Sequence, residues 1–340
     1  MKLAIHNSKT GFHPRWIKYC EVNNIPYKLV DCYDTNIIEN LKNCSALMWH
    51  HDQANAKDIL LAKSLLFALE QSGISIFPNF NTAWHFDDKV GQKYLLEAIG
   101  APLVPSFAFY SKEAALEWAN QTQFPKVFKL RGGAGSANVK LARTKGAAIK
   151  LIKKAFNRGF RQYEPLSNLK ERYRKYKQGN TNLWDVIKGC IRIFYEPKYS
   201  KVIGNELGYI YFQEFMPNND YDIRIIAIDG KAFALKRMVR EGDFRASGSG
   251  DFKVAKEEFD ERCVQIALET NKKLNAQGLA YDFIFDEKNN PLIVEVSFGF
   301  VTDVYDPCPG YWDKNLKWHE GEFIPQDWMV ESLIEKHINE

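Results

Sequence analysis

Residues 279–297 read LAYDFIFDEKNNPLIVEVS and predict two apolar strands, 279–286 and 291–296, around a turn at Asn289 and Asn290. Each strand carries one acid among apolar neighbours, Asp282 and Glu295. A carboxylate inside an apolar strand is costly unless it is paired, hydrogen-bonded or bound to a metal. Two on adjacent strands repel each other unless a cation joins them. The pair therefore indicates a Mg²⁺ site, with acids at a strand edge facing water as the alternative.

The first 86 residues alternate short apolar strands with amphipathic helices. Such alternation predicts parallel pairing and a small doubly wound sheet. The expected strands are 2–6, 26–31, 46–50 and 74–78, and the expected helices are 14–24 and 57–71. His50, His51 and Asp52 follow the third strand, where open sheets bind ligands, but solvent-exposed loop histidines are the alternative reading.

A second unit begins at Asp88 and Lys89 and contains a glycine-rich turn, 131–138, directly after Lys129. Glycines let backbone N–H groups approach a polyphosphate, and a neighbouring lysine neutralises its charge. The turn contains neither GxxxxGK[ST] nor GxGxxG, so a flexible hairpin tip remains open as the alternative. The elements expected here are helices 90–99, 112–120 and 147–156 and strands 124–130 and 139–142.

Further strands are predicted at 209–215, 223–228 and 231–239, followed by a helix over 259–277. Alternation along the second strand sets Asp222 and Arg224 apart from its apolar face. The cations at 224, 236, 237 and 245 could converge on phosphates, and surface salt bridges could equally explain each of them. A last helix is expected over 328–338.

The composition is that of an ordinary globular protein. The 340 residues are 45% hydrophobic and 26% charged, which argues against disorder or a coiled coil for the whole chain. No long apolar stretch predicts a membrane span, and the N-terminus lacks the apolar region of a signal peptide, so a cytoplasmic protein is expected. The six cysteines form no CxxC pair.

The net charge of +4 is unevenly spread along the chain. Residues 158–203 hold 11 Lys and Arg against four acids, a local charge of +7. This basic segment is either a solvated helix face or a patch for an anionic substrate or a nucleic-acid backbone. Its charge favours an acidic carboxylate substrate, such as a uronic-acid glycan or an acidic peptide. The aromatic and acidic tail, 301–340, suits a sugar or an amine, or plain packing.

The motifs, taken in order, resemble those of the ATP-grasp proteins, most closely the RimK-like and glutathione-synthetase-like carboxylate–amine ligases. The resemblance covers about residues 85–300. It rests on Asp88-Lys89, Lys129 with its glycine-rich turn, Gln213-Glu214-Phe215-Met216, Asp222-Ile223-Arg224, Lys236-Arg237, Asp243-Phe244-Arg245, Asp282 and Glu295-Val296-Ser297.

The resemblance implies a mixed α/β and α+β fold, in which a doubly wound N-terminal parallel domain precedes a two-lobed ATP-grasp domain. The implied domains are 1–86, an ATP-grasp core over 87–300 with a mobile lid lobe over about 124–212, and a C-terminal tail over 301–340.

The resemblance also implies roles for single residues. Lys89 and Lys129 would contact the phosphates of ATP, and the loop with Gly132, Gly133, Gly135 and Ser136 would close over them. Gln213, Glu214, Phe215 and Met216 would line the adenine site through backbone groups of Glu214 and Met216, and Asp222 would hold the ribose. Arg224, Lys236, Arg237 and Arg245 would bind the transferred phosphate. Asp282, Glu295 and Ser297 would hold two Mg²⁺ ions, with Glu295 bridging them.

Three positions depart from the family pattern. Ser297 and Ser247 each stand where relatives have Asn, and Phe298-Gly299-Phe300 replaces Ser-Pro-Gly. A serine hydroxyl is a shorter and weaker ligand than an amide oxygen, so one ion could be held through water.

The activity implied is a Mg²⁺-dependent ligase that uses ATP to join a carboxylate donor to an amine acceptor through an acyl-phosphate. Two other functions remain open. One is a protein that binds a polyanion or a nucleic acid, in which ATP has only a regulatory role or is not bound at all. The pattern of the basic segment argues against it, because its aromatic residues are not interleaved with its basic ones. The other is a small-molecule kinase on the same fold.

Overall fold

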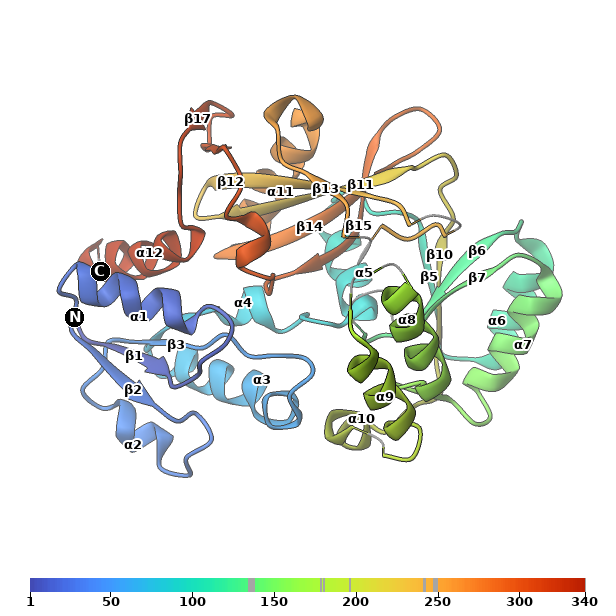
Figure 1. Cartoon of the computed structure of the whole chain (residues 1–340), viewed down its shortest axis with the longest axis horizontal. Coiled ribbons are helices and arrows are strands. Elements are labelled where there is room, and N and C mark those ends of the chain that lie inside the picture. Colours follow the sequence, from blue (N-terminus) through green and yellow to red (C-terminus); the bar gives the residue numbers. More distant parts are fainter. Residues whose placement is uncertain are drawn as a thin grey trace. The chain divides into compact units, whose positions relative to one another are not determined.

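The computed structural model describes residues 1–133, 138–177, 179, 181–195, 197–240, 243–246 and 250–339. The chain divides into two compact units. The first comprises residues 1–52, 61–104 and 216–340, and the second comprises residues 53–60 and 105–215. Figure 1 shows the elements of both units.

The first unit begins with a four-stranded parallel sheet in the order β2-β1-β3-β4. Its parallel pairing confirms the prediction from alternating strands and helices. The strands are β1 (Leu3–His6), β2 (Tyr27–Val30), β3 (Ala46–Met48) and β4 (Ser75–Phe77). The helices are α1 (His13–Val22), α2 (Ile37–Leu41), α3 (Ala56–Gln71), α4 (Phe80–Ala83) and α5 (Lys89–Ala98).

The second sheet of this unit is antiparallel, in the order β15-β14-β11-β12-β16-β17, with β13 paired to β12. Its strands are β11 (Tyr221–Ile228), β12 (Lys231–Met238), β13 (Phe252–Lys253), β14 (Gly278–Phe285), β15 (Pro291–Ser297), β16 (Gly310–Trp312) and β17 (Trp318–Glu320). Two α-helices, α11 (Glu261–Leu274) and α12 (Pro325–Asn339), and two short 3₁₀ helices, η1 (Lys256–Glu258) and η2 (Asp303–Tyr305), complete the unit.

The two faces of this antiparallel sheet bury different partners. Residues of α11, such as Val264 and Ala267, pack against Ile225 and Tyr281 on one face. On the other face, strand residues such as Ile226 and Phe233 share a core with β1, β3, α1 and α12. Because α12 lies beside α1 (Figure 1), the first and last segments of the chain form one core. The chain's contacts thus divide it differently from the predicted ranges 1–86, 87–300 and 301–340.

The second unit is built on a four-stranded antiparallel sheet in the order β5-β10-β6-β7, backed by α6 and α7. These elements are β5 (Ser106–Phe109), β6 (Lys126–Lys129), β7 (Val139–Ala142), β10 (Ile210–Glu214), α6 (Lys112–Gln121) and α7 (Lys145–Ala155). The basic segment, which had no predicted elements, forms α8 (Pro165–Lys177), α9 (Leu183–Ile191) and α10 (Lys198–Ile203), flanked by the short pair β8 (Phe160–Arg161) and β9 (Asn205–Glu206).

Among the residues that the structure describes, no helix has both the length and the apolar character needed to cross a bilayer.

Candidate active site

A row of charged side chains crosses four neighbouring strands, β15, β14, β11 and β12. The strand register places Glu295 opposite Asp282, Asp282 opposite Arg224, and Asp222 opposite Arg237. Directly opposed residues point to the same face of a sheet, and so do residues two apart on one strand. These five side chains therefore lie on the same face of the sheet. Further along the strands, this face packs into the apolar core with β1 and α12.

Two arginines and two aspartates of this row form a buried ion-pair cluster. Arg224 donates from Nε to Asp282 Oδ1 at 2.5 Å and from Nη2 to Oδ2 at 2.9 Å. Arg237 Nη2 lies 2.9 Å from Asp282 Oδ2, and its Nε and Nη2 each donate to Asp222 at 2.6 Å. Burial disfavours the charged form of Asp282, but the charges of Arg224 and Arg237 outweigh burial and hold its pKa below the ordinary value.

The two predicted metal ligands lie beside each other on neighbouring strands. Asp282 and Glu295 are register partners on β14 and β15, and Ser297 lies two residues beyond Glu295 on the same face. Carboxylate oxygens are the donors that Mg²⁺ prefers. Within the described part of the chain, no group of three or more His, Cys, Asp or Glu is placed to hold a metal. The residues thus fit an ion whose remaining ligands are phosphate oxygens and water.

The hydroxyl of Ser297 is already engaged, because it donates to the carbonyl of Gly299 at 2.9 Å. Only its oxygen lone pairs are left for an ion. Its direct ligation of metal stays a prediction.

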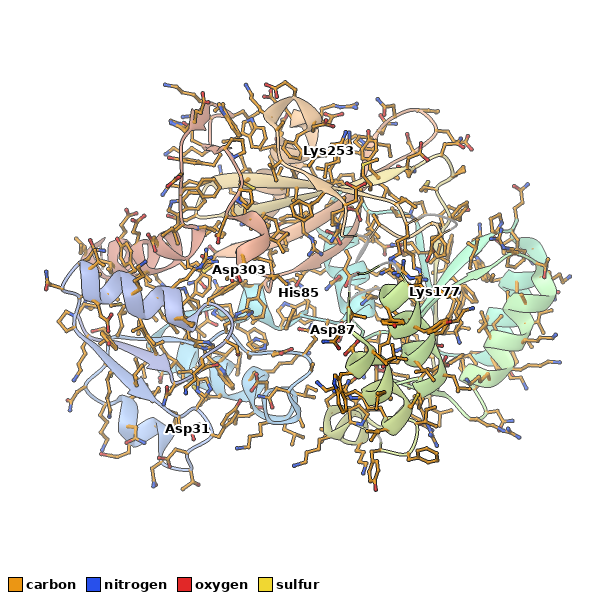
Figure 2. All side chains as sticks on the ribbon, in the orientation of Figure 1. Asp31, His85, Asp87, Lys177, Lys253 and Asp303 are labelled. Atoms are coloured by element: carbon orange, nitrogen blue, oxygen red, sulfur yellow. The ribbon has the colours of Figure 1, made fainter. Side chains whose placement is uncertain are left out.

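The start of α5 brings a further cation to this row. The side chain of Asp88 caps the helix by accepting from the N–H of Gly91 at 2.9 Å. Lys89 follows, almost fully buried, with Nζ 3.1 Å from Glu295 and 3.6 Å from Asp87 (Asp87 is labelled in Figure 2). The ammonium of Lys89 therefore neutralises the carboxylate that the sequence assigns to metal.

Gln92, one turn further along α5, positions β15 and was not predicted from the sequence. Its side chain accepts from the N–H of Val296 at 3.2 Å and donates to the carbonyl of Val296 at 2.8 Å. These reciprocal bonds hold the strand next to Glu295. A polar residue on a helix gives no signal of such a role when its partner lies 204 positions away.

Tyr305 was also missed by the sequence reading. It is buried on η2, packs against Phe233 and Phe300, and lies close enough to Arg224 for the two side chains to interact. Burial raises the pKa of the Tyr305 hydroxyl, and the charge of Arg224 opposes the rise. The tail thus contributes a hydroxyl beside the arginine cluster. From the sequence, the tail was known only to be rich in aromatic and acidic residues.

The structure does not bring Lys236 into the cluster. Lys236 precedes Arg237 on β12 and therefore points to the opposite face, where it pairs with Glu258 at 2.8 Å and lies over the ring of Tyr221. Arg245 forms a two-pronged ion pair with Asp243, with distances of 2.5–2.9 Å. The position of Lys236 therefore does not support its binding the same phosphate as Arg224 and Arg237, and the role of Arg245 stays a prediction.

In the second unit, Lys129 lies at the end of β6 and is almost fully buried. Its Nζ donates to Gln213 Oε1 at 2.7 Å, and Gln213 in turn donates to the hydroxyl of Ser106 at 3.2 Å. The N–H of Glu214 donates to the carbonyl of Pro105 at 2.8 Å, and the role of Glu214 at adenine stays a prediction. The carbonyl of Met216 accepts from Asn219 at 3.4 Å, and Phe215 links these two backbone groups.

Gly132 and Gly133 follow Lys129 in the turn that joins β6 to β7, which pair as predicted. Gly133 has a φ of +124°, a conformation that favours glycine. Gly135, Ser136 and Ser247 lie outside the described residues, so their assignments stay predictions.

The reading of His50 and His51 as solvent-exposed loop residues was wrong. His51 is 5% exposed and packs among Trp49, Phe86 and Phe298. His50 is half-buried, stacks on Phe12 and accepts its N–H at Nδ1. Burial lowers the pKa of both histidines to about 3, so both are neutral at pH 7.

Comparison with known proteins agrees with this fold. Residues 198–303 match the family model of the RimK-like ATP-grasp domain. The search of curated protein sequences returned no match.

Three solved structures illustrate the likeness of the whole chain. The D-alanine–D-alanine ligase from Bacillus anthracis complexed with ATP is 13% identical, with a TM-score of 0.58, over 100% of this chain and 98% of that one. The RimK domain ATP-grasp protein from Sphaerobacter thermophilus is 12% identical, with a TM-score of 0.56, over 98% of this chain and 100% of that one. The biotin carboxylase domain of the Hydrogenobacter thermophilus 2-oxoglutarate carboxylase, solved with MgADP, ADP and bicarbonate, is 14% identical, with a TM-score of 0.58, over 98% of this chain and 69% of that one.

These identities are low, so the likeness establishes the fold. The parallel N-terminal sheet and the antiparallel sheets that follow it are the architecture that the sequence resemblance implied. The chain therefore has the ATP-grasp fold, and residues 198–303 are similar to the RimK-like ATP-grasp domain, which agrees with the resemblance found in its sequence.

Proposed function

We propose that this protein is an ATP-dependent ligase that joins a carboxylate to an amine through an acyl-phosphate. One observation carries the proposal: the paired carboxylates Asp282 and Glu295 lie in register on one sheet face, in direct contact with Arg224, Arg237 and Lys89. Buried carboxylates bound to cations suit a site that exchanges those contacts for Mg²⁺ and phosphate.

The reaction takes place in two steps. An oxygen of the substrate carboxylate attacks the γ-phosphorus of ATP, and ADP leaves with the electrons of the broken P–O bond. The lone pair of the amine then attacks the acyl carbon, phosphate leaves, and the amine loses a proton. Bound Mg²⁺ would neutralise charge on the phosphate oxygens.

The chain's own residues supply fixed positive charge for the first step. Arg224 and Arg237 are held in one orientation by Asp222 and Asp282, and guanidinium groups bind phosphate oxygens in a two-pronged manner. Lys89 at the start of α5, and Lys129 with Gly132 and Gly133 in the second unit, are the proposed contacts to the phosphates of ATP. Cations gathered near the phosphates in this way would stabilise the negative charge that develops in the transition state.

Similar structures support the cofactors of this proposal. One of the neighbours described above was solved with ATP and another with MgADP. The specific carboxylate and amine are left open.

The proposal is tested by measuring ADP release with Mg²⁺ over mixtures of carboxylates and amines. Asp282→Asn and Glu295→Gln are each expected to slow release by roughly 100-fold, because each removes a carboxylate proposed to hold the Mg²⁺ that neutralises the phosphates. Glu287→Gln is the matched control, since Glu287 is an exposed acid in the turn of the same hairpin. Full turnover in both site variants would refute the metal assignment.

Product analysis separates the ligase from a kinase on the same fold. A ligase forms ADP, phosphate and an amide only when both the carboxylate and the amine are present. A stable phosphorylated product formed without an amine would instead identify a small-molecule kinase.

A further inference from the structure

The basic segment exposes an unusual amount of apolar surface. Of the 23 large apolar side chains that are exposed in the described chain, 12 lie between residues 166 and 207. Exposed apolar residues are normally scattered singly, and contiguous patches mark interaction sites. The segment is therefore not the plain solvated helix face that its charge allowed.

Helix α9 presents its apolar side chains outward. Leu183, Trp184, Ile187 and Ile191 are exposed, with Trp184 at 70%. The opposite side of α9 packs on α8 through Gly189, where an added Cβ would lie 2.8 Å from Arg172 Cδ and 3.0 Å from Leu169 Cδ1. Arg172 also ion-pairs with Asp185 on this inner side. The contact between the helices thus uses a glycine and an ion pair, and the apolar stripe is left outside.

The turn after α9 continues the apolar surface. Ile193, Phe194 and Tyr195 are all exposed, Phe194 at 83% and Tyr195 at 73%. Two large exposed aromatic rings in this turn therefore follow the exposed apolar side chains of α9 directly in the chain. We call the exposed large apolar side chains of residues 183–195 the apolar ridge.

Unneutralised cations flank this ridge. The described acids of the segment are already paired: Glu164 with Lys140, Glu171 with Arg174, and Asp185 with Arg172. Among the described cations of the segment, seven others have no carboxylate within 4.0 Å: Arg158, Arg161, Lys170, Lys188, Arg192, Lys198 and Lys201. Another cation, Lys177, lies over the ring of Tyr173 (Lys177 is labelled in Figure 2).

We infer that the apolar ridge docks on an anionic lipid surface. Trp, Phe and Leu on one side with Lys and Arg beside them is the composition of segments that lie in the membrane interface. Exposed apolar side chains can enter the region between lipid headgroups without a shaped partner, while the cations of α9 and α10 bind the headgroup phosphates. This inference goes beyond the ligase proposal and does not depend on it.

The experiment measures co-sedimentation of the full chain with vesicles of phosphatidylcholine alone or mixed with phosphatidylglycerol, at low and high salt. Binding is expected only to the mixed vesicles, and it should weaken with salt. Two variants test the two components: Trp184→Ser with Phe194→Ser and Tyr195→Ser, and Lys188→Gln with Arg192→Gln, Lys198→Gln and Lys201→Gln. The charge variant should bind about fivefold more weakly for each cation removed.

Matched controls use exposed residues of the same unit. Tyr110→Ser removes an aromatic ring that is 61% exposed, and Lys150→Gln with Lys153→Gln removes exposed cations of α7. Both controls should bind as the parent does, and circular dichroism should show all variants folded.

Three results would overturn the inference. The first is absence of binding to anionic vesicles at low salt. The second is equal binding to polyglutamate or single-stranded RNA that depends on the cations and not on the apolar ridge, which indicates a polyanion site. The third is a dimer in sedimentation velocity that the apolar variant abolishes, because a second copy of the chain would then cover the ridge.

Discussion

At the scale of the residue, the candidate site is a set of cations held on carboxylates. Lys89 lies on Glu295, and Arg224 and Arg237 lie on Asp282. A buried carboxylate must be neutralised, and an ammonium or guanidinium does this as well as a metal ion does. In the proposed ligase, each of these cations leaves its carboxylate for phosphate when Mg²⁺ binds.

This exchange predicts opposite effects of one substitution on two ligands. Lys89→Met should tighten Mn²⁺ binding several-fold in the absence of nucleotide, because Glu295 loses its competing ammonium. It should also weaken ATP binding by roughly tenfold or more, because a charged contact to phosphate is lost. Titration calorimetry measures both.

Lys93→Met is the control for this prediction, since Lys93 lies on the same helix and pairs with Glu97. If Lys89→Met weakens the binding of Mn²⁺ and of ATP equally, Lys89 serves only to hold the start of α5 against β15.

At the scale of the element, the end of β3 in the parallel sheet is followed by two neutral histidines, His50 and His51. His51 follows β3 and is enclosed by aromatic rings. Burial is the main cause that lowers the pKa of His51 from 6.5 to about 3, and the nearby charge of Lys63 adds to it. The unfolded chain binds a proton at this residue below about pH 6.5, whereas the folded chain does not. His51 therefore supports folding fully above pH 6.5, and this support is lost as the pH falls towards 3.

We predict that His51 makes the unfolding free energy depend on pH. Between pH 7.5 and pH 5, His51 should account for about 2 kcal/mol of the loss in unfolding free energy. His51→Gln should reduce that loss by this amount in urea unfolding measured at both pH values. His337→Gln, at an exposed histidine of α12, should leave it unchanged. Equal losses in both variants would contradict the burial of a neutral His51.

At the scale of the whole molecule, the C-terminal helix belongs to the core of the N-terminal sheet. Leu333 on α12 is 1% exposed and shares a core with residues of β1, α1, β11 and β12. Hydrogen bonds also join α1 to the tail, from Arg15 to Asp306 and from Tyr19 to Glu331. The tail is thus a structural part of the first unit.

Leu333→Ala should lower the unfolding free energy by about 2–5 kcal/mol, because it leaves a cavity in this shared core. Ile338→Ala on the same helix should change it by less than about 0.5 kcal/mol, since Ile338 is 75% exposed. Urea denaturation measures both. A small effect at Leu333 would mean that α12 is a detachable tail.

The sequence by itself determined the order of the motifs and many of the elements, although not those of the basic segment. The parallel sheet, the hairpin of Asp282 and Glu295, and the pairing of β11 with β12 follow from local patterns of period two and 3.6, which need no distant partner. That period also separates Lys236 from Arg237, because adjacent residues on a strand face opposite sides, although the motif reading had grouped them.

Tertiary structure alone decided which residues complete the site. Gln92 is brought to β15, and Tyr305 to Arg224, by elements that are far apart in the chain. Neither residue type predicts such a contact. It likewise decided that His51 is buried and that the apolar stripe of α9 is not. Burial depends on which surfaces meet, and a one-dimensional pattern records only which surfaces are apolar.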